Sequence, residues 1–152
     1  MLFQQINRSN AEKVYVICKN IKGAVASANY PLFYDTADTT GGNDGYAVSA
    51  ARTGQKFMFA GIPPTAIADD GVGLVQVYGK GSAYVLVTTS MVAGDQLDAS
   101  ISTVHLVNFI PVSATSLVTT ETTNPWNFVT AMSAMASGIS TAVLEPVFIR
   151  AL

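Results

Sequence analysis

The sequence predicts an all-β protein, a compact antiparallel β-barrel or sandwich with long loops rich in glycine and threonine. Short runs of β-branched and aromatic residues recur along the 152-residue chain, and clusters of Gly, Asp, Asn and Pro separate them. Side chains that alternate with a period of two are typical of half-buried strands. Regular short strands with turn signals between them favour a barrel or a sandwich. The length is that of one domain.

The clearest strand pattern lies between Gly61 and Leu97. Alternating apolar residues at 74–78 precede a glycine-rich break at 79–82, and a second alternating run follows at 84–87. Alternation interrupted by glycine is the signal of a β-hairpin. We therefore predict a hairpin here, at the structural centre of the domain.

Other segments extend this pattern in both directions. Residues 1–12 are expected to form an N-terminal arm, and residues 13–152 a single β-domain. Glycine, threonine and serine dominate the stretches 35–45 and 112–123, which are predicted to be long loops. Further strands are predicted at residues 13–19, 55–60, 103–110 and 143–152, and residues 32–34 form a short apolar stretch.

The segment 126–135 fits two structures. Asn124 as an N-cap, Pro125 as the first helical residue and Gly138 as a terminator would make it a helix. The alternation from Phe128 to Met135 suits a strand instead. Periodicity alone does not decide between them.

Charge is sparse in this chain. Charged residues make up 12% of it, against about 25% in ordinary soluble proteins, and 49% of the residues are hydrophobic. Few charges are available to keep a large surface monomeric, so we expect another protein to cover much of that surface. The alternative is a small β-domain with a neutral polar surface.

The net charge of −2 and the scattered basic residues argue against direct binding of nucleic acid. No apolar run is long enough for a transmembrane helix, and the N-terminus has no secretion signal, so we expect no membrane association. The single cysteine, Cys18, forms no intrachain disulfide and fits assembly in a reducing cytoplasm.

Residues capable of catalysis are few, and none stands in a recognisable motif. His105 is the only histidine and lies in a predicted strand, and Cys18 is predicted to be a small buried core residue. One Cys and one His exclude the usual zinc sites within one chain. Lys80 lies at a predicted turn without the spacing of a phosphate loop. We expect no enzyme activity.

Carboxylates in the 35–45 loop suggest calcium, because hard cations need several oxygen ligands, but the spacing of Asp35, Asp38 and Asp44 matches no EF-hand. We therefore expect no metal and no cofactor. Trp126 is a candidate interface anchor, with a core position as the alternative. The apolar residues Leu2, Phe3 and Ile6 of the arm are candidates to become ordered against a partner.

Three stretches together resemble the capsid cement, or decoration, proteins of tailed bacteriophages. They are Ala60-Gly61 with the run from Asp70 to Gly79, the segment from Val92 to Leu97, and the ending from Val147 to Leu152. The resemblance covers roughly residues 13–152. The long 35–45 loop and the threonine-rich 112–123 stretch depart from the family pattern.

The resemblance implies a compact β-barrel or β-tulip-like fold and a homotrimer on the outside of the virion. Such a trimer binds the major capsid protein at the junctions between capsomers and stabilises the shell against the pressure of the packaged DNA. The family favours a strand over residues 128–135 and carries no catalytic residues.

Two alternatives remain open. A head-fibre or receptor-binding module would present pockets at the long loops instead of a flat adhesive base. A small β-barrel hydrolase or carbohydrate-binding module would need His105, Asp35 or Asp44 to converge with Trp126 in a concave site.

Overall fold

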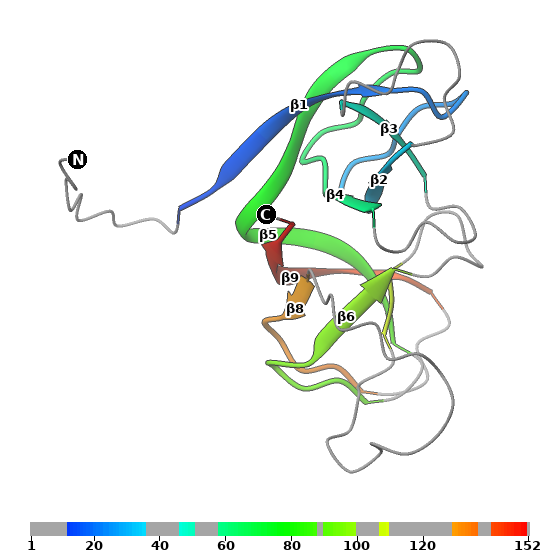
Figure 1. The fold of residues 1–152 in the computed structure, drawn as a ribbon. Coiled ribbons are helices and arrows are strands. Elements are labelled where there is room, and N and C mark those ends of the chain that lie inside the picture. The colour runs from blue at the N-terminus through cyan, green and yellow to red at the C-terminus, as the bar shows by residue number, and fades with distance from the viewer. Residues whose placement is uncertain are drawn as a thin grey trace, which may run out of the picture.

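The computed structural model describes residues 12–35, 46–50, 58–87, 90–99, 107–109, 129–136 and 141–151. Within these ranges the prediction of an all-β, barrel-like fold is confirmed (Figure 1). The strands are β1 (Val14–Asn20), β2 (Leu32–Tyr34), β3 (Ala47–Ser49), β4 (Phe59–Gly61), β5 (Val72–Val87), β6 (Gln96–Ala99), β7 (Val107–Phe109), β8 (Val129–Ala131) and β9 (Val143–Arg150).

The strands form one nine-stranded sheet in the order β4-β2-β3-β1-β5-β7-β6-β8-β9, with a further pairing between β5 and β9. Most neighbours are antiparallel, as expected, but β1 with β3 and β5 with β7 are parallel. The sheet is therefore mixed. Figure 1 shows β5 passing from an upper group of strands, β1 to β4, into a lower group that contains β6, β8 and β9.

The predicted hairpin at 74–87 is wrong, because β5 is one continuous strand of 16 residues. Its first half pairs with β1 and its second half with β9, so the two halves do not pair with each other. Gly79 has φ 97°, and a Cβ there would overlap the carbonyl oxygen of Glu12. Glycine can adopt this conformation without a steric penalty. Here it bends the strand instead of reversing it.

The first half of β5 belongs to a closed circuit of strands, which we call the upper circuit. It runs from β5 through β1, β3, β2 and β4, and an isolated bridge between Ile62 and Gln76 returns it to β5. Both backbone hydrogen bonds of that bridge form, at 3.0 and 2.9 Å. The circuit surrounds a buried cluster of Cys18, Ala26, Leu32, Val48, Ala60, Ile67 and Val75.

The second half of β5 belongs to the lower circuit, which runs through β7, β6, β8 and β9 and back to β5. It surrounds the larger core cluster, which also takes in Phe33, Phe59 and Ile62 from the upper circuit. The Phe33 and Phe59 rings meet edge to face with centroids 5.8 Å apart. The two circuits therefore share both a strand and part of their core.

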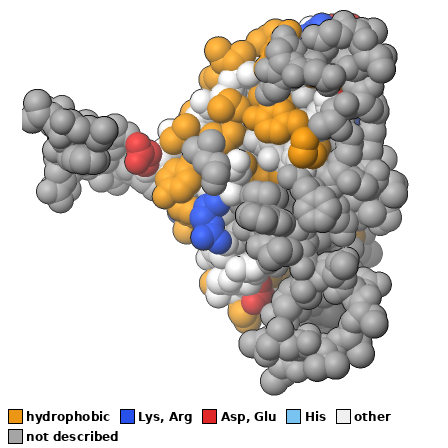
Figure 2. All heavy atoms as spheres, in the orientation of Figure 1, with side chains coloured by type: hydrophobic (Ala, Val, Ile, Leu, Met, Phe, Trp, Pro, Cys, Tyr) orange, Lys and Arg blue, Asp and Glu red, His pale blue; other side chains and the backbone are white. Residues whose placement is uncertain are grey.

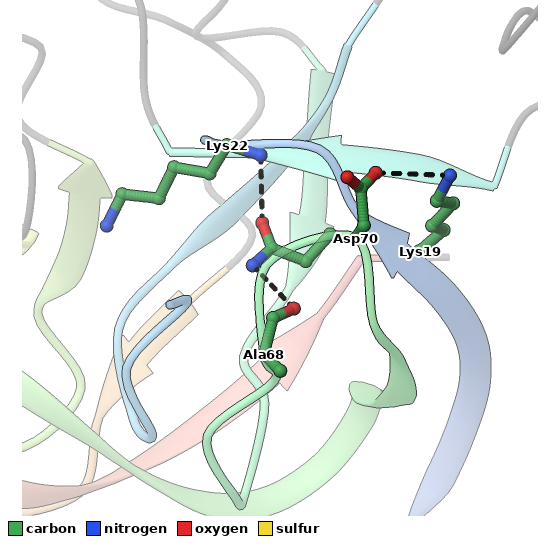
Figure 3. A network of polar contacts seen from close by, with 5 residues as sticks. Lys19, Lys22, Ala68 and Asp70 are labelled. Atoms are coloured by element: carbon green, nitrogen blue, oxygen red, sulfur yellow. Dashed lines mark hydrogen bonds and ion pairs between the residues drawn. The ribbon is translucent and has the colours of Figure 1, made fainter. Parts of the chain in front are cut away.

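Asn20, at the end of β1, organises the polar interior of the upper circuit. Its side-chain Nδ2 lies 2.9 to 3.1 Å from the carbonyl oxygens of Ala24, Ile67 and Ala68. Its Oδ1 accepts the backbone N–H of Lys22 at 3.0 Å. Figure 3 shows the contacts to Lys22 and Ala68 beside the ion pair of Lys19 with Asp70. One buried amide thus holds two loops to β1.

The strand predictions at 13–19 and 143–152 correspond to β1 and β9, and the short apolar stretch 32–34 forms β2. Those at 55–60 and 103–110 correspond to β4 and β7 where the structure describes them. Residues 126–135 are not a helix where described, because β8 pairs with β6 and β9, and Met135 bridges Met91. This confirms the strand interpretation for that part.

Candidate interaction surface

The outer face of the upper circuit carries exposed apolar side chains along two paired strands. Val16, Cys18 and Val75 point into the core, so their neighbours along β1 and β5 point outward. Ile17 and Leu74 are direct cross-strand partners. Exposure is 65% for Ile17, 62% for Val72, 49% for Leu74 and 38% for Tyr15. We call these four residues the outer strip.

Figure 2 shows hydrophobic side chains gathered along the side of the molecule where β1 runs in Figure 1. Scattered exposed apolar residues are normal on a protein surface, but adjacent ones on paired strands form a continuous patch. Such patches mark sites of association.

Charged groups lie at both ends of the outer strip. At one end Lys19, paired in register with Val72, makes a 3.2 Å ion pair with Asp70. At the other end, Glu12, Val14, Tyr78 and Arg150 line a shallow depression of about 390 Å³. The ring of Tyr78 packs edge to face on that of Phe148 at 5.3 Å. The strip is therefore apolar in its middle and polar at its rim, as protein interfaces are.

Among the described strands, one edge of β1 lacks a partner along most of its length. β5 pairs with β1 from Val14 to Lys19, whereas β3 pairs only with Lys19 and Asn20. No described strand pairs with the other edge of Val14–Cys18. An open edge offers backbone donors and acceptors to a further strand.

The Cys18 thiol is fully buried, which confirms its prediction as a core residue. Burial raises its pKa to about 11, so the thiol stays neutral at physiological pH. Burial also raises the pKa of Tyr34, and the nearby Cys18 adds to that rise. Neutral buried groups of this kind support packing.

Several predicted residues lie outside the described ranges. They include the interface candidates Leu2, Phe3, Ile6 and Trp126, the residues His105, Asp38 and Asp44, and the loop segments 36–45 and 112–123. Asp35 is described and buried at the end of β2, where its backbone N–H donates to Ala47. The convergence of His105, Asp35 or Asp44 with Trp126, which the hydrolase or carbohydrate-binding alternative requires, lies outside the described residues.

Two other features are absent from the described ranges. No three His, Cys, Asp or Glu side chains gather there as a metal site would require. Nor does that part of the chain contain a helix long and apolar enough to cross a membrane.

The sequence analysis did not predict the outer strip, although the composition of residues 14–17 indicates it. Residues 14–17 are apolar at every position, so this strand has no polar face. Such a strand must be covered on both sides or leave apolar groups in water. No protein-family model and no curated protein matches the chain, so the strip rests on the geometry of the chain alone.

Proposed function

We propose that this chain is a structural virion protein of a tailed bacteriophage, a cement protein that binds the outside of the capsid and bridges major capsid protein subunits. The observation that supports the proposal is the outer strip, where Ile17 and Leu74 pair across β1 and β5 and remain exposed at 65% and 49%. The resemblance of the sequence to cement proteins supplies the partner. The protein acts by binding and not by catalysis.

The physical basis is the burial of the outer strip against the shell. Apolar surface removed from water contributes roughly 25 cal/mol per Å². A patch of four side chains therefore gives a modest affinity after the cost of association is subtracted. In a homotrimer three such patches engage together, and avidity raises the overall affinity by about 10²–10⁴.

The low charge of the chain supports the same proposal. With 12% charged residues, long-range electrostatic steering contributes little to association. Binding through apolar contact should therefore survive high salt, because screening weakens only the charged pairs at the rim of the strip.

Light scattering combined with co-sedimentation tests the proposal. The purified protein is measured for mass in solution, then mixed with shells assembled from the major capsid protein of the same phage without this chain. We expect a trimer that sediments with the shells at low and at high salt. A monomer that stays in the supernatant would contradict the proposal.

A further inference from the structure

A hollow of about 250 Å³ lies at the bend of β5, between the two circuits. Lys13 and Tyr15 contribute one wall, Asn29 and Pro64 another, and Gln76 and Lys80 lie on β5 itself. Ligand sites are often found where two structural units meet. The hollow is distinct from the outer strip, with which it shares only Tyr15.

Gln76 presents an unsatisfied acceptor there. Gln76 is buried, with only 4% of its surface exposed. Its side-chain Nε2 donates to the carbonyl oxygens of Tyr78 and Lys80, both at 3.1 Å. If the amide were flipped, its oxygen would face two carbonyl oxygens and could not donate to them. The two hydrogen bonds therefore determine which atom is Nε2 and which is Oε1. No described residue donates to Oε1. A buried acceptor without a donor is costly, and a ligand hydroxyl would satisfy it.

Gly81 keeps space beside that acceptor. A Cβ at this position would lie 3.0 Å from Oε1 of Gln76 and 3.0 Å from Cδ1 of Ile149. Real Cβ atoms rarely approach other atoms so closely, and glycine avoids the contact. Gln76 and Gly81 both line the hollow, so the space that glycine leaves lies next to Oε1 at its wall.

The hollow is positively charged. Lys13 and Lys80 line it, and the described residues supply no ion-pair partner to either ammonium group. None of the residues lining the hollow is an Asp or a Glu. Two lysines in a hollow whose lining contains no Asp or Glu favour an anionic ligand.

Asn29 is held rigidly at the wall. Its φ of 64° is in the left-handed region, which asparagine tolerates better than most residues. Its backbone N–H donates to Pro63 at 2.8 Å, and its carbonyl accepts the N–H of Tyr84 at 3.0 Å. Backbone conformations of this kind often occur at ligand sites. The side-chain amide of Asn29 is left to line the hollow.

We propose that the hollow binds one acidic sugar residue, a uronic acid. Its carboxylate pairs with Lys13 and Lys80, and a ring hydroxyl donates to Oε1 of Gln76. The apolar face of its ring packs on Tyr15 and Pro64, as sugar rings pack on apolar side chains. A volume of about 250 Å³ is below that of sites for drug-sized ligands and suits a single ring.

The test is an NMR titration of the isotope-labelled full chain with galacturonate. Galactose lacks the carboxylate, acetate lacks the ring, and a glutamate-containing tripeptide represents an acidic protein segment. We expect galacturonate to bind with a Kd of roughly 1 mM, as befits a small ligand, and to shift residues of the hollow. The other three ligands should bind at least about fivefold more weakly.

Two variants locate the site. Lys80→Gln should weaken galacturonate binding roughly tenfold, because it removes one charged partner. Lys13→Gln removes the other charged partner and should weaken binding to a similar extent. Lys22→Gln removes an equal charge elsewhere and should leave the Kd unchanged.

Several results would overturn the proposal. They are no shift with galacturonate, equal affinity for galactose or acetate, tighter binding of the peptide, or equal weakening by Lys80→Gln and Lys22→Gln. The proposal goes beyond capsid binding, and none of these results bears on the co-sedimentation experiment.

Discussion

The two circuits that share β5 are closed in different ways. In the lower circuit, β9 pairs with β5 over the whole stretch from Tyr78 to Val85. In the upper circuit, the single bridge between Ile62 and Gln76 completes the ring, and a polar side chain, Asn20, lies in the interior. A long paired stretch with an apolar core opens less readily than one bridge. The lower circuit is therefore expected to provide stability, and the upper circuit carries the proposed binding surface.

The largest effect is expected where the circuits join. Gly79→Ala would place a Cβ over the carbonyl oxygen of Glu12 in a backbone with φ 97°. We expect the free energy of unfolding to fall by about 3 kcal/mol or more, because strain and overlap add. Denaturant titration followed by circular dichroism measures it.

Gly94→Ala is the matched control. Gly94 has φ 99°, yet nothing lies within 4 Å of the Cβ that would be added. Only the backbone strain remains, and we expect the free energy of unfolding to fall by about 1 kcal/mol. Equal losses of unfolding free energy at the two glycines would show that the close approach of Glu12 to the bend does not matter.

Asn20→Ala tests the polar interior of the upper circuit. The substitution removes the amide's contacts with the carbonyls of Ala24, Ile67 and Ala68 and takes the Oδ1 acceptor from the Lys22 N–H, while Ile67 keeps the Ala26 N–H as a donor. We expect the free energy of unfolding to fall by about 2–4 kcal/mol, measured in the same denaturant titration. Hydrogen exchange should rise in the upper circuit before the lower one. A uniform rise across both would contradict the comparison.

Val147→Ala makes the reciprocal change in the lower circuit, where Val147 is completely buried in the core. Removing two methyl groups there should cost about 2 kcal/mol through lost burial and a small cavity. Because the pairing of β5 with β9 is long, hydrogen exchange in the lower circuit should rise only through global unfolding. Selective exchange in the lower circuit would reverse the assignment of stability.

Alkaline pH should destabilise the upper circuit. Burial raises the pKa of Cys18 from 9.0 to about 11, so the unfolded thiol loses its proton at lower pH than the folded one. The stabilisation is complete below pH 9 and is lost as the pH rises through 11. The raised pKa of Tyr34 acts in the same direction. Cys18→Ala should make the free energy of unfolding less dependent on pH between 9 and 11. An unchanged slope in this range would contradict the assignment to Cys18.

The smallest effect is expected at the rim of the outer strip. Asp70→Asn removes the 3.2 Å ion pair with Lys19, and asparagine tolerates the φ of 56° at this position. We expect the free energy of unfolding to change by less than about 0.5 kcal/mol, because Asp70 is exposed. A denaturant series at low and high salt measures it. A salt-independent loss above 1 kcal/mol would give the pair a structural role that its exposure does not predict.

Local pattern predicted the strand content well and the central connection poorly. The runs at Val14–Asn20 and Val143–Arg150 are rich in β-branched residues and form strands as expected. At 79–82 the same glycines fit either a turn or a bend. The segment bends instead of turning back because its two halves pair with β1 and β9 and not with each other. That preference depends on strands far away in the sequence, so local pattern does not reveal it.

The short strands β3 and β6 escaped prediction for a related reason. Ala47–Ser49 is buried at all three positions, so it shows no alternation. Pairing with β1 and β2, and not local propensity, makes it a strand. The outer strip was not predicted for the same reason, because the exposure of Ile17 and Leu74 depends on which face of the strands the core occupies.

Co-sedimentation of two matched variants tests the central claim most directly. Leu74 lies in the outer strip at 49% exposure, and Leu144 lies on β9 in the lower circuit at 46%. Leu74→Glu and Leu144→Glu introduce the same charge at equal exposure, and circular dichroism confirms that both fold. We predict that Leu74→Glu stays in the supernatant while Leu144→Glu sediments with the capsids. Equal retention of the two variants, or loss of Leu144→Glu alone, would contradict the account.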